Sequence, residues 1–169
     1  MKFAYADPPY IGQAKKHYDC PEVDHSALIK QLMDEYPDGW ALSLSSPTLK
    51  QILNMCPDNG RVGAWVKPFA VFKINVNPKY CWEPVIFYGG RKYERYDAKV
   101  RDFVSANITM QKGCPGAKPK EFAFWIFELL NMKPEDDFVD LYPGSGNMIR
   151  AWFEFKNLCP TPLFKEIVE

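Results

Sequence analysis

The chain has 169 residues and a mass of 19.5 kDa, a typical size for one domain with its own hydrophobic core. Hydrophobic residues make up 47% of it and charged residues 25%, which excludes a disordered or low-complexity chain. Basic and acidic residues both number 21, so bulk charge does not attract nucleic acid and only local basic patches remain as contacts. We expect a single domain over residues 1–169.

Cellular location and metal content can also be estimated from composition. No apolar run approaches the roughly 18 residues that cross a membrane, and the first residues lack the apolar stretch of a signal peptide, so we expect a cytoplasmic protein. The five cysteines are widely spaced, with no CxxC pair, and there are only two histidines. This pattern predicts reduced, mostly buried thiols and no metal site.

Short apolar runs that end at proline or glycine alternate along the chain with segments of helical spacing. Strands are predicted over 3–6, 40–44, 61–66, 84–88 and 138–142. Helices are predicted over 25–36, 46–56, 120–131 and 147–155, the first with Asp24 as its N-cap. Residues 11–23 are predicted to form a loop, and 68–78 are ambiguous. Because several strands are apolar on both faces, we predict a three-layer α/β fold with a mostly parallel sheet.

The tetrapeptide Asp7-Pro8-Pro9-Tyr10 follows the first predicted strand. By average composition it is expected by chance in roughly one chain of this length in a thousand. The Asp7 carboxylate and the Pro8 carbonyl can both accept hydrogen bonds from an NH2 group, which orients the lone pair of a weakly nucleophilic exocyclic amine. The two prolines fix the backbone, and Tyr10 offers a face on which a flipped base can stack. These residue types favour methylation of a base amine over a simple turn.

The second motif runs from Phe138 to Gly146, where a predicted strand leads through Pro-Gly-Ser-Gly into a helix. Glycines at such a turn let the backbone approach a ligand closely, and a helix N-terminus favours an acceptor or a negative group. Asp140 can pair with the amino group of an amino-acid-like cofactor. The third glycine of the dinucleotide-binding fingerprint is missing, so a tight structural turn is an alternative.

Together these motifs resemble the DNA amino-methyltransferases that use S-adenosylmethionine (SAM), in the permuted class whose catalytic motif precedes the cofactor motif. Residues 7–10 resemble the catalytic DPPY motif, and residues 140–146 resemble the DxFxGSG loop. Residues 114–119 are similar to the KP-containing motif on the cofactor side, and 82–87 resemble the family strand that carries a glutamate. The resemblance spans nearly the whole chain and implies a Rossmann-like methyltransferase fold with permuted motif order.

The resemblance also implies roles for individual residues. Asp7, Pro8, Pro9 and Tyr10 would hold the target amine. Glu166 is the candidate acid for the ribose hydroxyls, in a C-terminal segment so short that we expect the sheet to lack an edge strand. The SAM-binding residues implied are Lys118, Pro119, Asp140, Tyr142, Gly144, Ser145, Gly146, Asn147 and Glu166.

No segment is set apart as a target-recognition domain, so loops must contact the nucleic acid. The two candidate loops are residues 11–23 and 89–112, and tyrosines that could stack on bases lie within the second one. The residues expected at phosphates are Lys15, Lys16, Arg91, Lys92, Arg95, Lys99 and Arg101. For each of them a solvated surface is the alternative interpretation.

The function expected from this resemblance is transfer of a methyl group from SAM to the N6 amine of an adenine flipped out of DNA. Cytosine N4 or RNA adenine methylation is the nearest variant. A degenerate member that binds nucleic acid without catalysis, or a subunit that depends on a partner for target recognition, is the alternative from another class. The chain is expected to be a monomer or a homodimer.

Overall fold

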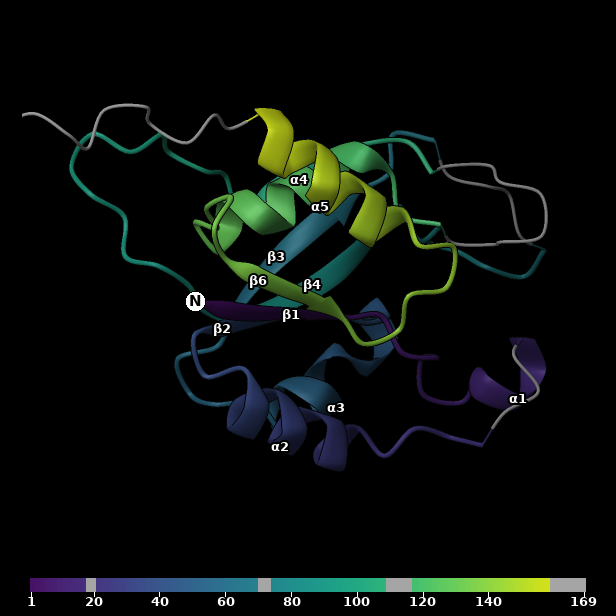
Figure 1. Ribbon diagram of the computed structural model, residues 1–169. Helices are drawn as coiled ribbons and strands as arrows, with labels where there is room; N and C mark the ends of the chain where they lie inside the picture. Colours follow the sequence, from purple (N-terminus) through teal and green to yellow (C-terminus); the bar gives the residue numbers. More distant parts are fainter. Residues whose placement is uncertain (18–20, 70–73, 109–116, 159–169) are drawn as a thin grey trace, which may run out of the picture.

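The computed structural model describes residues 1–17, 21–69, 74–108 and 117–158. Strands and helices alternate along these ranges, as Figure 1 shows. The strands are β1 (Lys2–Ala6), β2 (Gly39–Ser43), β3 (Arg61–Val66), β4 (Trp82–Gly89), β5 (Phe103–Ser105) and β6 (Asp137–Asp140). The helices are α1 (Ala14–His17), α2 (His25–Glu35), α3 (Leu49–Leu53), α4 (Lys120–Leu129) and α5 (Asn147–Leu158), with a short 3-10 turn over Ser46–Thr48 before α3.

The strands form one sheet in the order β5-β3-β4-β2-β1-β6. β1 pairs in parallel with both β2 and β6, and β3 pairs in parallel with β5. Only β4 is antiparallel to its two neighbours. All the other strands of the sheet therefore run in one direction and end at the same edge, which confirms the prediction of a mostly parallel sheet.

Helices cover both faces of the sheet, α4 and α5 on one side and α2 and α3 on the other (Figure 1). Alternate residues of each strand supply the two cores, because successive side chains point to opposite faces. In β1, Phe3 and Tyr5 pack in the core under α4 and α5, whereas Ala4 and Ala6 pack in the core under α2 and α3. This double burial is why the strands are apolar along their whole length.

Local signals set the helix boundaries. Asp24 caps α2, since its carboxylate accepts a hydrogen bond from the Ala27 N–H at 3.0 Å, as the sequence predicts. Pro119 is the N-cap residue of α4, where its missing N–H costs nothing. Six buried residues of α4, among them Phe122 and Phe127, anchor it to the sheet.

Most predicted elements are found within one or two residues, and the differences have physical reasons. β4 starts at Trp82, two residues before the predicted start, because Trp82 pairs with Val66 of β3. The short elements α1 and β5 were not predicted, since neither is long enough to show a period. α5 continues to Leu158, beyond the predicted end at residue 155.

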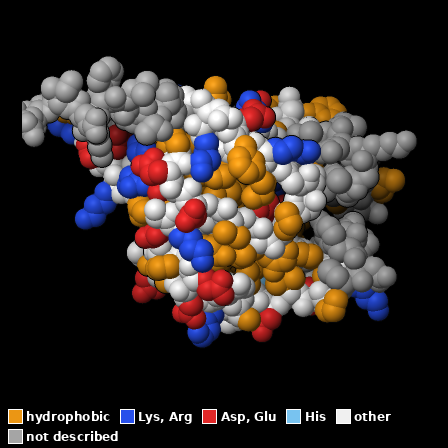
Figure 2. Space-filling view, in the orientation of Figure 1, with side chains coloured by type: hydrophobic (Ala, Val, Ile, Leu, Met, Phe, Trp, Pro, Cys, Tyr) orange, Lys and Arg blue, Asp and Glu red, His pale blue; other side chains and the backbone are white. Residues whose placement is uncertain are grey.

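β6 is the last strand of the described order, and residues 159–169 lie outside the description. Val139, Leu141 and Tyr142 in and after this strand are only partly buried. In the view of Figure 2, hydrophobic side chains gather over β6 and its neighbouring strands.

Candidate active site

Acidic residues from separate strands meet at the edge of the sheet where the parallel strands end. Asp7 follows β1, and Asp140 is the last residue of β6, where it pairs with Tyr5 of β1. Glu83 lies at the start of β4, which runs the opposite way and therefore begins at this edge. Alternation along β1 and β4 gives Asp7 and Glu83 the same face as Tyr5 and Val85, the face covered by α4 and α5.

Side chains around Asp7 form a bonded group that we call the acid–lysine cluster, consisting of Asp7, Tyr10, Lys67, Glu83 and Lys118. Lys118 Nζ lies 3.1 Å from Asp7 Oδ2 and 3.2 Å from Glu83 Oε2. Lys67 forms a second ion pair with Glu83. The Tyr10 hydroxyl lies 3.1 Å from Glu83 Oε2 and 3.4 Å from Asp7 Oδ1, so two carboxylates share its single proton. Two acids and two lysines thus balance in charge.

Burial and charge act in opposite directions on the pKa values of this cluster. Lys118 is only 7% exposed, and burial alone would lower its pKa, but Asp7 and Glu83 outweigh burial and raise it. Burial would raise the pKa of Glu83, yet Lys118 and Lys67 together lower it. Among the described residues Asp7 pairs with a single lysine, so burial dominates and its pKa is raised, with Glu83 adding to the rise. Asp7 is therefore the less compensated acid of the two.

Trp65 of β3 supports both lysines from below. The centre of its ring lies 4.6 Å from Lys67 Nζ and 5.2 Å from Lys118 Nζ. The ring is buried, and its Nε1 donates to the Ala106 carbonyl at 2.9 Å. Because cation–π attraction strengthens where water is excluded, this ring holds the two ammonium groups in place beside Glu83.

The turn from β6 into α5 exposes its backbone. Gly144 and Gly146 have φ values of 45° and 72°, in the left-handed region that favours glycine. A Cβ on Gly146 would meet nothing within 4 Å, and one on Gly144 would meet only the Tyr142 carbonyl, at 3.8 Å. The first amides of α5 have no acceptor within the helix, so this open turn suits a hydrogen-bonding ligand.

Asp140 stands between this turn and Asp7. Its Oδ1 accepts the Tyr142 N–H at 3.2 Å. Burial raises its pKa to about 6, the Tyr142 bond offsets part of the rise, and the charge of Asp7 adds to it. Within the described ranges, no ion pair reaches Asp140. A half-buried carboxylate with no ion-pair partner among the described residues is suited to a cationic ligand.

The segment before α4 links the turn to the acid–lysine cluster. Asn147 Nδ2 donates to the Lys118 carbonyl at 3.2 Å, so the first residue of α5 holds Lys118 and Pro119 next to the turn. The resemblance assigned Lys118 to the cofactor side, and the structure brings its ammonium group to Asp7 and Glu83. The Ser145 carbonyl accepts from Arg150 at 3.0 Å, which stabilises the turn. Glu166 lies outside the described residues.

The expected phosphate contacts divide between two places. Lys15 and Lys16 lie in α1, shortly after the DPPY motif. The stretch 91–101 leaves the sheet at the opposite edge, because it follows the C-terminal end of the antiparallel strand β4. There Arg91 forms an ion pair with Asp136 at 2.6 Å. The residues of this stretch that the structure does not bring together with Asp7 are Arg91, Lys92, Arg95, Lys99 and Arg101.

Two members of the acid–lysine cluster were not among the candidate site residues. Glu83 was noted only through the family strand, and Lys67 carried no signal beyond its place directly after a predicted strand. Their partnership depends on the β3–β4 pairing, which places Trp65 opposite Glu83. A sequence without strand order does not reveal that pairing.

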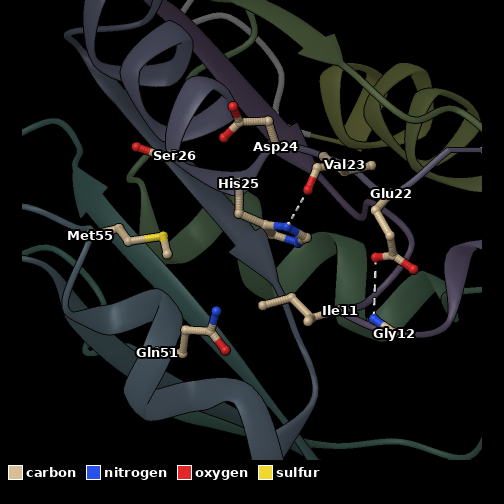
Figure 3. Close-up of a pocket in the computed structure, with 9 residues that line it drawn as sticks. All are labelled: Ile11, Gly12, Glu22, Val23, Asp24, His25, Ser26, Gln51 and Met55. Atoms are coloured by element: carbon tan, nitrogen blue, oxygen red, sulfur yellow. Dashed lines mark hydrogen bonds between the residues drawn. The ribbon is translucent and has the colours of Figure 1, made fainter.

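An open pocket of about 480 Å³ is lined by the chain segment that follows Tyr10, by the start of α2 and by residues in and after α3. In Figure 3 the His25 ring points into it, with Ile11 and Met55 at its sides. His25 Nδ1 donates to the Val23 carbonyl at 2.9 Å, so Nε2 is the acceptor of the neutral ring. The acid–lysine cluster does not line this pocket.

Two other classes of site are absent from the same described ranges. These ranges contain no group of three or more metal-ligating side chains. They also contain no helix that is long and apolar enough to cross a membrane. Cys56 and Cys81 are free thiols, and burial raises the pKa of Cys56 to about 11.

Comparison with solved structures finds the same fold in two crystal structures of M1.HpyAVI. The M1.HpyAVI–SAM complex matches with a TM-score of 0.63 and 16% sequence identity, over 92% of this chain and 78% of that one. A crystal structure of M1.HpyAVI matches with a TM-score of 0.61 and 15% identity, over 91% and 76%. No protein-family model matches the sequence, and a search of curated proteins finds no match. The predicted Rossmann-like α/β fold is therefore confirmed.

Proposed function

We propose that this chain transfers a methyl group from SAM to the exocyclic N6 amine of an adenine that is flipped out of DNA. The observation that carries the proposal is the position of Asp7. It is a half-buried carboxylate with a raised pKa, at the same sheet edge as the glycine turn and Asp140. The M1.HpyAVI–SAM complex, which has the same fold, supports SAM as the cofactor.

The residues at this edge fit SAM in charge and in shape. SAM carries an α-amino cation and a sulfonium cation, and the two carboxyl groups of raised pKa, Asp7 and Asp140, are neighbours that suit positive charge. Its carboxylate would bind amides near the N-terminus of α5, across the open backbone of Gly144 and Gly146. Tyr142, Ser145 and Asn147 belong to the same turn, with Lys118 and Pro119 next to it. When bound, SAM supplies an electrophilic methyl group.

The chain's own residues prepare the amine. An adenine amine is a poor nucleophile because its lone pair is delocalised into the ring. Asp7 and the Pro8 carbonyl would accept hydrogen bonds from its two N–H groups, so that the nitrogen becomes tetrahedral and its lone pair points at the methyl group. The amine would take the methyl group as the S–C bond of SAM breaks, and the nitrogen would then release one proton to water.

In this mechanism Lys118 competes with the amine for Asp7, because its ammonium group lies 3.1 Å from Asp7 Oδ2. Glu83 offers Lys118 a second carboxylate at 3.2 Å. When the amine takes its place on Asp7, Lys118 can keep its pairing with Glu83, so no ammonium group is left buried without a partner. Tyr10 likewise keeps Glu83 as its acceptor.

The same ion pair favours a second candidate function. In a chain that only binds nucleic acid, Lys118 would stay on Asp7 permanently and neutralise it. The two candidates differ in whether SAM binds and whether methyl groups reach DNA.

The test is titration calorimetry with SAM, followed by incubation of the full chain with DNA and methyl-labelled SAM and mass spectrometry of the digested nucleosides. We expect saturable binding and N6-methyladenine. The matched control is Asp58→Asn, an exposed aspartate in the turn after α3, which should act like wild type. The absence of any methylated base in the DNA would contradict the proposed function, and the absence of SAM binding as well would favour the second candidate. N4-methylcytosine would keep the chemistry and correct the base.

A further inference from the structure

The connection between β3 and β4, residues 67–82, carries large apolar side chains that face solvent. Phe69 is 66% exposed, Tyr80 56% and Trp82 39%. Soluble proteins seldom leave several aromatic side chains open on one short segment unless the segment binds a partner. We call the side chains of Phe69, Lys79, Tyr80 and Trp82 the hairpin surface.

The hairpin surface adjoins the acid–lysine cluster. β4 begins at the edge where β1 and β2 end, so its first residue, Trp82, lies at the Asp7 edge of the sheet. Trp82 directly precedes Glu83, which contacts Tyr10 and Lys118. The Lys67 N–H donates to the Cys81 carbonyl at 2.7 Å, which closes the base of the connection beside the cluster.

The charge of the connection is uniformly positive. From Lys67 to Trp82 the sequence contains three lysines and no acidic residue. Lys79 is exposed next to Tyr80. Alternating lysines and exposed aromatic rings are the usual composition of a surface for unpaired nucleic acid strands, since bases stack on the rings and phosphates meet the cations. Protein interfaces, by contrast, are depleted in lysine.

The basic stretch 91–101 is a weaker candidate for the same strand. It leaves the sheet at the opposite edge, and it includes the acids Glu94 and Asp97 among its basic residues. Several of its groups hold the fold together. Arg91 pairs with Asp136, and the Tyr93 hydroxyl donates to the Glu128 carbonyl. Tyr96 is 90% exposed, but it belongs to the stretch that leaves the sheet at the edge opposite the acid–lysine cluster.

We infer that the hairpin surface binds the nucleic acid strand that flanks the target base, with neighbouring bases stacked on Tyr80 and Trp82 and a phosphate near Lys79. This inference rests on the proposed function for the position of the target base at Asp7. The strand is unpaired where it crosses the surface, because stacking on a side chain requires an exposed base face.

The test compares Tyr80→Ala with Tyr96→Ala, the same change at the opposite edge of the sheet. Binding of a short fluorescein-labelled single-stranded DNA that contains adenine is followed by fluorescence anisotropy at fixed salt concentration. Loss of one stacking ring should weaken binding about tenfold for Tyr80→Ala. The control Tyr96→Ala should change the dissociation constant by less than about twofold, as expected where no base stacks.

A second position guards against a change in fold. Trp82 is partly packed, so Trp82→Ala is paired with Trp82→Phe, which keeps a ring, and both are checked by circular dichroism. Trp82→Phe should retain most of the affinity that Trp82→Ala loses. Equal effects of Tyr80→Ala and Tyr96→Ala, or no binding by the wild-type chain, would overturn the inference.

Methyl transfer by the same variants separates the two proposals. If wild type methylates DNA and Tyr80→Ala binds and methylates normally, the hairpin surface is wrong and the proposed function stands. If Tyr80→Ala weakens binding but wild type transfers no methyl group, the surface stands and the proposed function is wrong.

Discussion

The two edges of the sheet each hold a carboxylate among cations, and the two carboxylates differ in how fully they are bonded. At the edge where the strands begin, Asp136 accepts from the Met1 amino group at 2.9 Å, from Arg91 at 2.6 Å and from the Lys133 N–H at 2.7 Å. Its side chain is fully buried. Burial would raise its pKa, but these donors outweigh burial and lower it.

At the opposite edge, Asp7 has fewer donors and keeps a raised pKa. Its side chain is about a quarter exposed, and one lysine and the shared proton of Tyr10 are its described partners. This is the difference expected between a structural acid and a functional one, the roles that we propose for Asp136 and Asp7. A carboxylate saturated with donors ties chain segments together, whereas one with spare acceptor capacity in a partly dry place can receive a ligand.

Replacing each of the two carboxylates by an amide should have opposite consequences: the change at Asp7 should lower the rate of methyl transfer, and the change at Asp136 should lower the stability. Asp7→Asn should lower the rate of methyl transfer by roughly a hundredfold to a thousandfold, because one acceptor of the amine is lost where charge develops. Its melting temperature should stay close to that of wild type, since the charge it removes is poorly compensated. The measurements are transfer of labelled methyl groups and thermal unfolding.

Asp136→Asn is the matched change. It leaves Met1 and Arg91 without their acid, and we expect a loss of roughly 2 to 4 kcal/mol, less than for a fully buried pair because both cations are partly exposed. The pKa of Asp136 is lowered by folding, so its contribution is present above the unfolded pKa and is lost as pH falls. At pH values low enough to protonate Asp136 in both the folded and the unfolded chain, wild type and Asp136→Asn should have similar free energies of unfolding. If Asp7→Asn lost more stability than Asp136→Asn, the assignment of structural and functional acids would be reversed.

Glu83→Gln should also lower the rate of methyl transfer, but by less than Asp7→Asn. The variant keeps an acceptor for Tyr10 but removes the negative charge of Glu83. Lys118, which is now shared between Glu83 and Asp7, would then pair more strongly with Asp7, so we expect a roughly tenfold lower rate of methyl transfer. SAM affinity should be unchanged. Because the charge of Glu83 raises the pKa of Asp7, the acid limb of the rate profile should move to lower pH.

Two results around Glu83 distinguish positioning from a general structural defect. Lys67→Gln removes the other cation of Glu83 and leaves Lys118 in place, so its rate should fall by less than about threefold, as for a partly exposed ion pair. In the Lys118→Met background, Glu83→Gln should have little further effect on the rate, since Lys118 is no longer present to pair with Asp7. An acid limb that does not move would exclude an electrostatic link between Glu83 and Asp7.

The sequence predicts the fold well because its signals are local. Apolar runs that end at Pro8 or Gly144, and a cap such as Asp24, mark element boundaries without knowledge of tertiary contacts. β5 is the exception, since three residues show no period and the strand exists through its pairing with β3.

The site is predictable only where its residues are contiguous. DPPY and the glycine turn are short motifs, and their positions after β1 and β6 bring Asp7 and Asp140 to one edge. The contact of Lys118 with Tyr10 spans 108 residues, and that with Glu83 spans 35. These pairings depend on strand order and on the antiparallel direction of β4, which the sequence pattern does not contain.

A pH effect is expected at Asp140, whose pKa of about 6 should govern the pH dependence of SAM binding. If the ionised carboxylate pairs with the α-amino cation, the affinity should fall by up to about tenfold per pH unit below pH 6. The stability of the folded chain should depend on pH with the opposite sign to the SAM affinity. A raised pKa means that protonation stabilises the folded chain at low pH, and this stabilisation is lost as pH rises through about 6.

Asp140→Asn should therefore bind SAM more weakly than wild type at pH 8, and its SAM affinity should not fall at acid pH. Its melting temperature at pH 8 should be a few degrees higher, because the partly buried charge of Asp140 is removed. Calorimetry and thermal unfolding across pH 5 to about 8 measure both quantities on the same samples. Equal SAM affinity in wild type and variant would remove Asp140 from the cofactor site. If Asp140→Asn gains stability and loses SAM affinity, Asp140 is a carboxylate that the fold leaves without a cation so that a ligand can pair with it. Asp136→Asn should behave in the opposite way and lose stability.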